Sequence, residues 1–182
     1  MPTSTLQAFV IQTSARDQRQ RVDSGALTSF LSAHGISPPC STILDERLYL
    51  ASRRSAQGQK TLDRLKITHV LSILDDSREL TIPGNRVHHR ISLDDLESEN
   101  LLAILPEAVA WVNAAMGDDN ARIMVHCEHG VSRSASVVIA WLMKDREWGL
   151  EDSLAFVKEK RSAVNPNAGF LKQLKEWESV DG

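Results

Sequence analysis

The feature that most constrains the fold of this chain is a cysteine and an arginine in C-x5-R spacing, Cys127 and Arg133, set between two apolar segments. The apolar run 123–125 comes directly before the cysteine, and the largely apolar run 135–143 follows the arginine. Runs of these lengths predict a buried strand and then a helix. We therefore expect a strand–loop–helix unit, with Cys127 at the end of the strand and Arg133 at the start of the helix.

The predicted loop suits the binding of a phosphate beside a thiolate. A free cysteine, with a pKa of roughly 8.5, is mostly protonated at neutral pH, and only its thiolate is nucleophilic. A helix N-terminus directs unpaired N–H groups at the loop before it and stabilises an anion there. Gly130 permits a backbone conformation that a side chain would penalise, and Arg133 offers a planar fork for two phosphate oxygens. The substrate-binding loop comprises Glu128, His129, Gly130, Val131, Ser132 and Arg133.

Two neighbours of the loop suit supporting roles. Ser134 can donate its hydroxyl to the cysteine sulfur and help it leave, and His126 can hold the loop by hydrogen bonds to backbone carbonyls. The alternative is that Cys127 is one of the buried structural cysteines common in protein cores. An inert core cysteine would not need Gly130, Arg133 and Ser134 beside it, so we favour the catalytic interpretation.

The string His126-Cys127-x5-Arg133-Ser134 resembles the signature of the cysteine-dependent protein phosphatases, and residues 131–135 look most like the small, atypical dual-specificity phosphatases. The resemblance extends over residues 42–180. It implies an α/β fold with a central, mostly parallel, twisted sheet flanked by helices. It also implies hydrolysis of phosphotyrosine and phosphoserine or phosphothreonine through a phosphocysteine intermediate, with no metal or other cofactor. Three further segments are similar to the family's opening hairpin, helix-to-strand passage and entry to the last helix: 43–51, 65–71 and 165–171.

The family takes a general acid from a loop about thirty residues before the cysteine. This chain offers Asp94 and Asp95, and the register against the following helix favours Asp95. The carboxyl group must be protonated in the first step and ionised in the second, while Cys127 must be ionised, which gives a bell-shaped pH profile. The alternative is that the two aspartates only form a solvated helix entry.

The loop departs from many family members at Glu128 and His129. His129 resembles the histidine in the loop of the cysteine-type RNA 5′-triphosphatases, which continue differently after the arginine. Phosphoinositide phosphatases usually place lysines in the loop, and this loop has none. The loop therefore favours a phosphorylated protein as substrate. The alternatives are RNA 5′-triphosphate, a phosphoinositide, an inositol polyphosphate, a glucan phosphate, or a phosphopeptide-binding scaffold without activity. A solvated rim position for His129 is as consistent with the sequence as substrate selection.

Arg161 and the turn 165–167 are expected to line one wall of the pocket, with Asn167 supporting the loop. Arg161 could form a second anionic subsite for a doubly phosphorylated or acidic substrate. It could instead be a cation that complements the dipole at the end of a helix.

Charge and cysteine content exclude several classes of protein. The net charge of −3 and pI near 6.1 argue against broad binding to nucleic acid or anionic membrane. No apolar run approaches the roughly 20 residues of a membrane span. Two cysteines do not make a disulfide framework, and a catalytic thiol suits a reducing compartment, the cytoplasm or the nucleus.

The 182 residues fit one domain with a small extension. We divide them into an N-terminal extension, 1–40, that docks on the domain or binds a partner, and a catalytic domain, 41–182. Within the extension, 24–34 is a candidate helix. Within the domain, apolar patterns predict strands and helices in alternation, with Pro106 kinking the first long helix or restarting its hydrogen bonds: strands 69–74 and 87–91, and helices 99–115, 134–146, 151–161 and 168–179.

Overall fold

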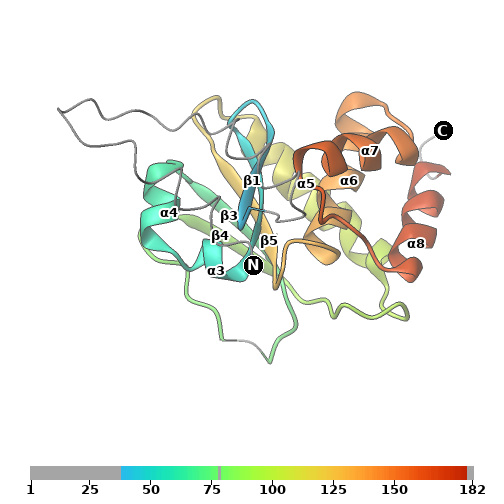
Figure 1. The fold of residues 1–182 in the computed structure, drawn as a ribbon, viewed down its shortest axis with the longest axis horizontal. Helices are drawn as coiled ribbons and strands as arrows, with labels where there is room; N and C mark the ends of the chain where they lie inside the picture. Colours follow the sequence, from blue (N-terminus) through green and yellow to red (C-terminus); the bar gives the residue numbers. More distant parts are fainter. Residues whose placement is uncertain (1–37, 78, 180–182) are drawn as a thin grey trace, which may run out of the picture.

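The computed structural model describes residues 38–77 and 79–179. A five-stranded sheet runs through its centre in the order β1-β2-β5-β3-β4 (Figure 1). β1 is antiparallel to β2, and the other neighbouring strands are parallel, which confirms the expected mostly parallel α/β fold. The strands are β1 (Cys40–Leu44), β2 (Leu48–Ser52), β3 (His69–Ile73), β4 (Val87–Ile91) and β5 (Ile123–Cys127).

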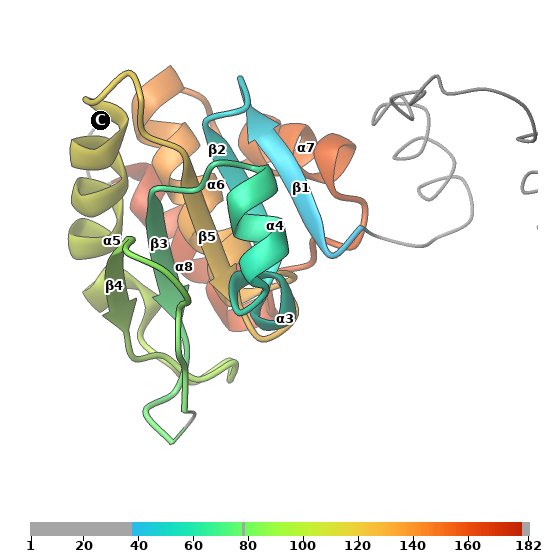
Figure 2. The ribbon, with the colours of Figure 1, turned by 90° about the vertical axis from the view of Figure 1, so that its left-hand side faces the viewer.

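Helices cover both faces of the sheet. Figure 2 shows α3 and α4 in front of the strands, with α6 and α8 behind them. Because both faces are covered, all five residues of β5 are buried, as expected of a central parallel strand. The helices are α3 (Arg53–Ala56), α4 (Gln59–Arg64), α5 (Leu101–Met116), α6 (Arg133–Arg146), α7 (Leu150–Lys160) and α8 (Ala168–Ser179).

The apolar patterns of the sequence correspond to these elements. The predicted strands are β3 and β4, and the four predicted helices are α5 to α8. α5 continues on both sides of Pro106. The candidate helix 24–34 lies outside the described residues.

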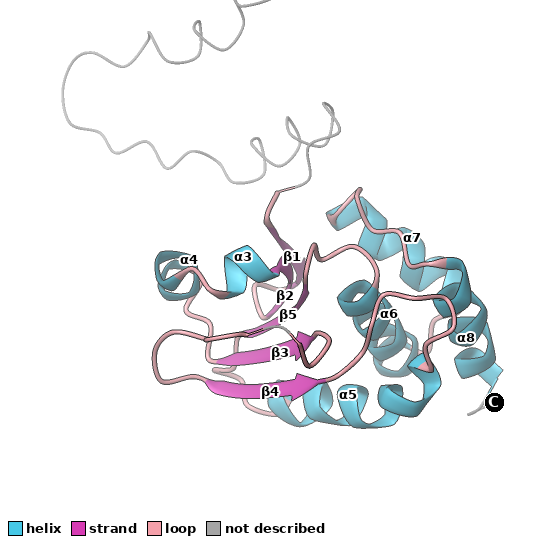
Figure 3. Cartoon of the chain, turned by 90° about the horizontal axis from the view of Figure 1, so that it is seen from below, coloured by secondary structure: helices cyan, strands magenta, loops and turns pink. Residues whose placement is uncertain are grey.

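The register of the parallel strands brings their carboxyl ends to one edge of the sheet. Cys127 is paired with Ser52 of β2, and His126 is paired with Ser72 of β3. Ser72 is in turn paired with Arg90 of β4. Figure 3 shows the arrowheads of β3 and β4 on the same side of the molecule, toward α6. Loops that leave this edge can therefore meet over the start of α6, which is where ligands bind in open α/β sheets.

Candidate active site

The Cys127 sulfur lies between two hydrogen-bond donors. Cys127 is the last residue of β5 and is only 1% exposed. Its Sγ accepts hydrogen bonds from the Ser134 hydroxyl at 3.1 Å and from the Gly130 backbone N–H at 3.3 Å. The N-terminus of α6, which begins at Arg133, faces the same loop. Hydrogen-bond donors and a positive helix end are groups that can stabilise an anion in this loop.

Gly130 is required by the shape of the loop. Its φ of +69° lies in the left-handed region, and a Cβ there would stand 2.5 Å from the Ala51 carbonyl oxygen. A side chain would thus meet both backbone strain and a steric clash with β2.

Arg133 lies under the loop with one donor unused. The residue is 7% exposed, and its Nη1 donates to the Leu93 carbonyl at 3.2 Å. Its buried Nε has no hydrogen-bond partner among the described residues and lies 3.6 Å from Asp95 Oδ2. A buried donor of this kind is costly to leave unpaired, so the position suits a bound anion.

Asp95, rather than Asp94, faces the loop. Its Oδ1 accepts from the Ser132 hydroxyl at 2.6 Å and from Asn167 Nδ2 at 3.0 Å. Asp94 is exposed, and it takes no part in these contacts within the described part of the chain. Both aspartates are exposed, but among the described residues only Asp95 contacts Arg133, Ser132 and Asn167.

Asn167 joins three parts of the site. Besides its bond to Asp95, its backbone N–H donates to Ser132 Oγ at 3.1 Å, and its Oδ1 accepts from the Phe170 N–H at 2.9 Å. It thereby fixes the start of α8 to the loop and to the aspartate. The sequence suggested Asn167 as a support, but the bond to Asp95 depends on residues 72 positions apart and had no local signal.

His126 is buried and contacts the backbone of Cys127. Its Nδ1 lies 3.2 Å from the Cys127 carbonyl oxygen, in agreement with the expected support of the loop, and its Nε2 lies 2.6 Å from Ser72 Oγ. Burial lowers the pKa of His126 to about 4, only partly offset by the bond to the Cys127 carbonyl. The ring is therefore neutral at physiological pH.

The rim of the loop carries a charge pair that sequence reasoning missed. Glu128 Oε2 lies 3.4 Å from Arg53 Nε, and the Arg53 N–H donates to the Glu128 carbonyl at 3.1 Å. Two arginines directly after the first hairpin were the only signal. The negative charge of Glu128 is therefore partly balanced by Arg53 before any substrate binds.

His129 is exposed at the rim of the loop. Further along the loop, the Val131 carbonyl accepts a hydrogen bond from the Asn165 N–H at 3.0 Å.

The predicted anionic subsite at Arg161 is wrong. Arg161 is 3% exposed and binds the loop from behind. Its Nε donates to the Gly130 carbonyl at 2.8 Å, its Nη2 to the His129 carbonyl at 2.9 Å, and its Nη1 to the carbonyl of Pro38. A guanidinium with its donors committed to backbone oxygens holds the loop in place and is not open to substrate.

Comparisons with known proteins agree with this geometry. The family described as "Dual specificity phosphatase, catalytic domain" matches residues 48–180. A Slingshot homologue protein phosphatase of Xenopus laevis is 39% identical over 137 residues, which cover 74% of this chain and 19% of that protein. The tyrosine-protein phosphatase yvh1 of Schizosaccharomyces pombe is 32% identical over 134 residues, which cover 74% of this chain and 40% of that protein. This chain therefore spans less than half the length of these curated relatives.

The fold of this chain also resembles that of a solved structure. The crystal structure of human DUSP28 aligns with a TM-score of 0.71 and 31% identity, covering 79% of this chain and 95% of that one. Among residues 38–77 and 79–179, no helix combines the length and apolar character that crossing a membrane requires.

Proposed function

The chain belongs to the dual-specificity phosphatase family, and from that membership we propose that it hydrolyses phosphotyrosine and phosphoserine or phosphothreonine in proteins through a phosphocysteine intermediate. The observation that carries the proposal is the position of Cys127 Sγ, which accepts from Ser134 Oγ and from the Gly130 N–H in one loop with Arg133. This arrangement stabilises a thiolate and presents it next to an unused guanidinium donor.

The first step is attack of the Cys127 thiolate on phosphorus. The S–P bond forms as the bond from phosphorus to the substrate oxygen breaks. Arg133 binds phosphoryl oxygens with its free Nε. Asp95 gives its proton to the departing oxygen, so that the product leaves as an alcohol or phenol.

The second step is hydrolysis of the phosphocysteine. Asp95, now ionised, takes a proton from a water molecule whose oxygen bonds to phosphorus while the S–P bond breaks. The Ser134 hydroxyl, 3.1 Å from Sγ, donates to the sulfur as negative charge returns to it. Inorganic phosphate is released and the thiolate is restored.

The test of this mechanism is a Cys127→Ser variant assayed with an aryl phosphate. Turnover is expected to vanish, whereas binding of vanadate or another phosphate mimic is retained, because the loop donors and Arg133 remain. Parent protein quenched during turnover should carry a phosphoryl group on Cys127, detected by mass spectrometry of the active-site peptide. Parent-like turnover in the variant would refute the mechanism.

The proposed substrate class rests on the loop and its rim. The loop holds no lysine, and Glu128 places a carboxylate at the rim, paired with Arg53. Neither feature suits a polyphosphate or an inositol phosphate with several negative charges. A side-by-side assay of phosphopeptides, RNA 5′-triphosphate, phosphoinositides and phosphorylated glucan should show the highest kcat/KM for phosphopeptides. A higher value for any of the other three would transfer the assignment to that class.

His129 offers a finer test of the same assignment. His129→Ala should leave the KM for a small aryl phosphate unchanged. A raised KM for extended polyanions at acid pH, where a histidine gains charge, would show that His129 selects substrate. If the variant and the parent have the same KM for every substrate at every pH, His129 is a solvated rim residue.

The remaining expectations concern the chain outside the site. We place the catalytic domain at 41–182 and assign 1–40 to docking or partner binding. A catalytic thiolate requires a reducing compartment, so we propose the cytoplasm, the nucleus or both as its location.

A further inference from the structure

A line of polar side chains crosses three neighbouring strands and ends at the nucleophile. Ser72 of β3 and His126 of β5 are paired in register, and both are fully buried. Ser72 Oγ lies 2.6 Å from His126 Nε2 and 2.9 Å from His88 Nε2. His88 lies on β4, at the edge of the sheet, and is exposed. The line therefore connects the protein surface to the carbonyl group of Cys127.

The chemistry of the groups gives each hydrogen bond in this line one direction. The Cys127 carbonyl oxygen can only accept, so His126 Nδ1 carries the proton. Because burial keeps His126 neutral, its Nε2 has no proton and accepts from the Ser72 hydroxyl. The Ser72 oxygen is then free to accept, and the Nε2–H of His88 donates to it.

We propose that His88 and Ser72 are positioning residues that fix the tautomer and orientation of His126 and thereby the start of the nucleophile loop. In the opposite tautomer, His126 would turn an unprotonated Nδ1 toward the Cys127 carbonyl oxygen, and two acceptors would repel each other. The carbonyl and the residue that carries Sγ would then shift. The bond from His88 prevents this, because it commits the Ser72 hydroxyl to donating toward His126.

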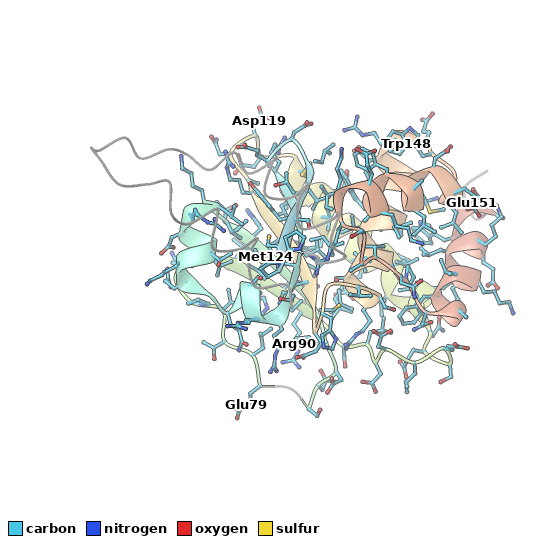
Figure 4. The ribbon with its side chains drawn as sticks, viewed as in Figure 1. Glu79, Arg90, Asp119, Met124, Trp148 and Glu151 are labelled. Carbon is cyan, nitrogen blue, oxygen red and sulfur yellow. The ribbon has the colours of Figure 1, made fainter. Side chains whose placement is uncertain are left out.

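The bond from His88 to Ser72 has the same direction in the neutral Nε2–H form of the ring and in its protonated form. Partial burial, together with the nearby charges of Arg90 and His89, lowers the pKa of His88. Because the Ser72 hydroxyl donates to His126, His88 Nε2 carries a proton in this contact, whether the ring is neutral or protonated. Figure 4 shows Arg90 at the lower end of the sheet, the end at which β5 leads into the loop.

The activity arm of the test compares variants at His88 and Ser72 with an aryl phosphate, and it rests on the proposed phosphatase function. Ser72→Ala, which removes both bonds, should lower kcat by about 10-fold or more with little change in KM. His88→Ala should lower it by a few-fold, and His88→Gln, whose amide can still donate to Ser72, should restore it. The matched control is His89→Ala, because His89 is the neighbour on β4 but bonds to Glu107; its kcat should equal that of the parent.

The second arm reads the tautomer of His126 directly by ¹⁵N NMR of the imidazole rings, and it does not require activity. Parent, His88→Gln and His89→Ala should show the proton on Nδ1, whereas Ser72→Ala and His88→Ala should show a mixture of tautomers. An unchanged tautomer in both latter variants, or a His88→Gln variant as impaired as His88→Ala, would overturn the proposal. If the parent hydrolysed no phosphate ester, the proposed function would fail. The tautomer measurement would still decide whether His88 and Ser72 position His126.

Discussion

The carboxylate of Asp95 has three partners, and an isosteric substitution can test its role while keeping most of these contacts. It accepts from Ser132 and Asn167 and lies beside Arg133. Asp95→Asn keeps an acceptor oxygen for these donors but has no proton to give. We predict that kcat falls by about 10²- to 10⁴-fold for a substrate with a poor leaving group, such as phosphoserine, and much less for an activated aryl phosphate.

The matched control for Asp95 is Asp94→Asn. Asp94 is exposed, so its substitution should change kcat by less than about twofold for either substrate. If the two variants ranked the other way, Asp94 would be the acid and Asp95 a structural ligand of Arg133.

His126 gives a pH dependence of stability with a defined sign. Its pKa is lowered by burial from 6.5 to about 4 in the folded chain. Between these values the unfolded chain binds more protons than the folded one, so stability falls as pH decreases from 6.5 toward 4. The full effect below pH 4 is about 3 kcal/mol at most. Urea unfolding of the parent and of His126→Asn at several pH values should show a shallower acid decline in the variant; parallel curves would contradict this.

At the residue level, the sequence predicted the groups that lie close together along the chain. Cys127, Gly130, Arg133 and Ser134 belong to one loop and one helix start, so local pattern was sufficient. Arg53 could not be predicted as a partner of Glu128, because β2 and β5 must first pair. The same holds for Ser72, whose contact with His126 spans 54 residues.

At the level of elements, the loop after β5 depends on close packing against β2. Gly130→Ala should destabilise the fold by about 1 to 3 kcal/mol, since its φ of +69° is strained for alanine and its Cβ would clash with Ala51. Turnover should fall by more than the loss of folded protein explains, because the displaced loop also carries the Gly130 N–H that donates to Cys127 Sγ. Gly117→Ala, at the end of α5 with a φ of −67°, is the control and should unfold almost as the parent does. Equal effects of the two substitutions on unfolding and turnover would contradict this account.

The elements were largely predictable because buried strands and amphipathic helices leave apolar patterns in the sequence. The exceptions have physical causes. The hairpin of β1 and β2 was indicated only by the family resemblance of 43–51, because its turn places Asp45 and Glu46 at positive φ, where glycine or asparagine would have been the local signal. α3 and α4 are too short to carry a full helical period.

At the level of the whole molecule, Arg161 binds together parts of the chain that are far apart in sequence. It follows α7, contacts the loop 128–133 through Gly130 and His129, and reaches Ser41 of β1. The order of strands that makes these contacts possible was not predictable from apolar runs, which indicate a strand but not its neighbour. This is why the sequence suggested a substrate contact at Arg161, whereas in the folded chain its buried side chain holds the loop by hydrogen bonds.

Replacing Arg161 tests whether its hydrogen bonds hold the loop in place. Arg161→Met leaves several buried carbonyl groups without donors and should lower the free energy of unfolding by about 2 to 5 kcal/mol. Because the loop itself loosens, kcat/KM should fall by the same factor for a small aryl phosphate and for a doubly phosphorylated peptide. Lys160→Met, at the preceding and more exposed position, is the control and should change neither quantity appreciably. A loss confined to the doubly phosphorylated peptide, with parent-like unfolding, would instead show that Arg161 binds a second anion of the substrate.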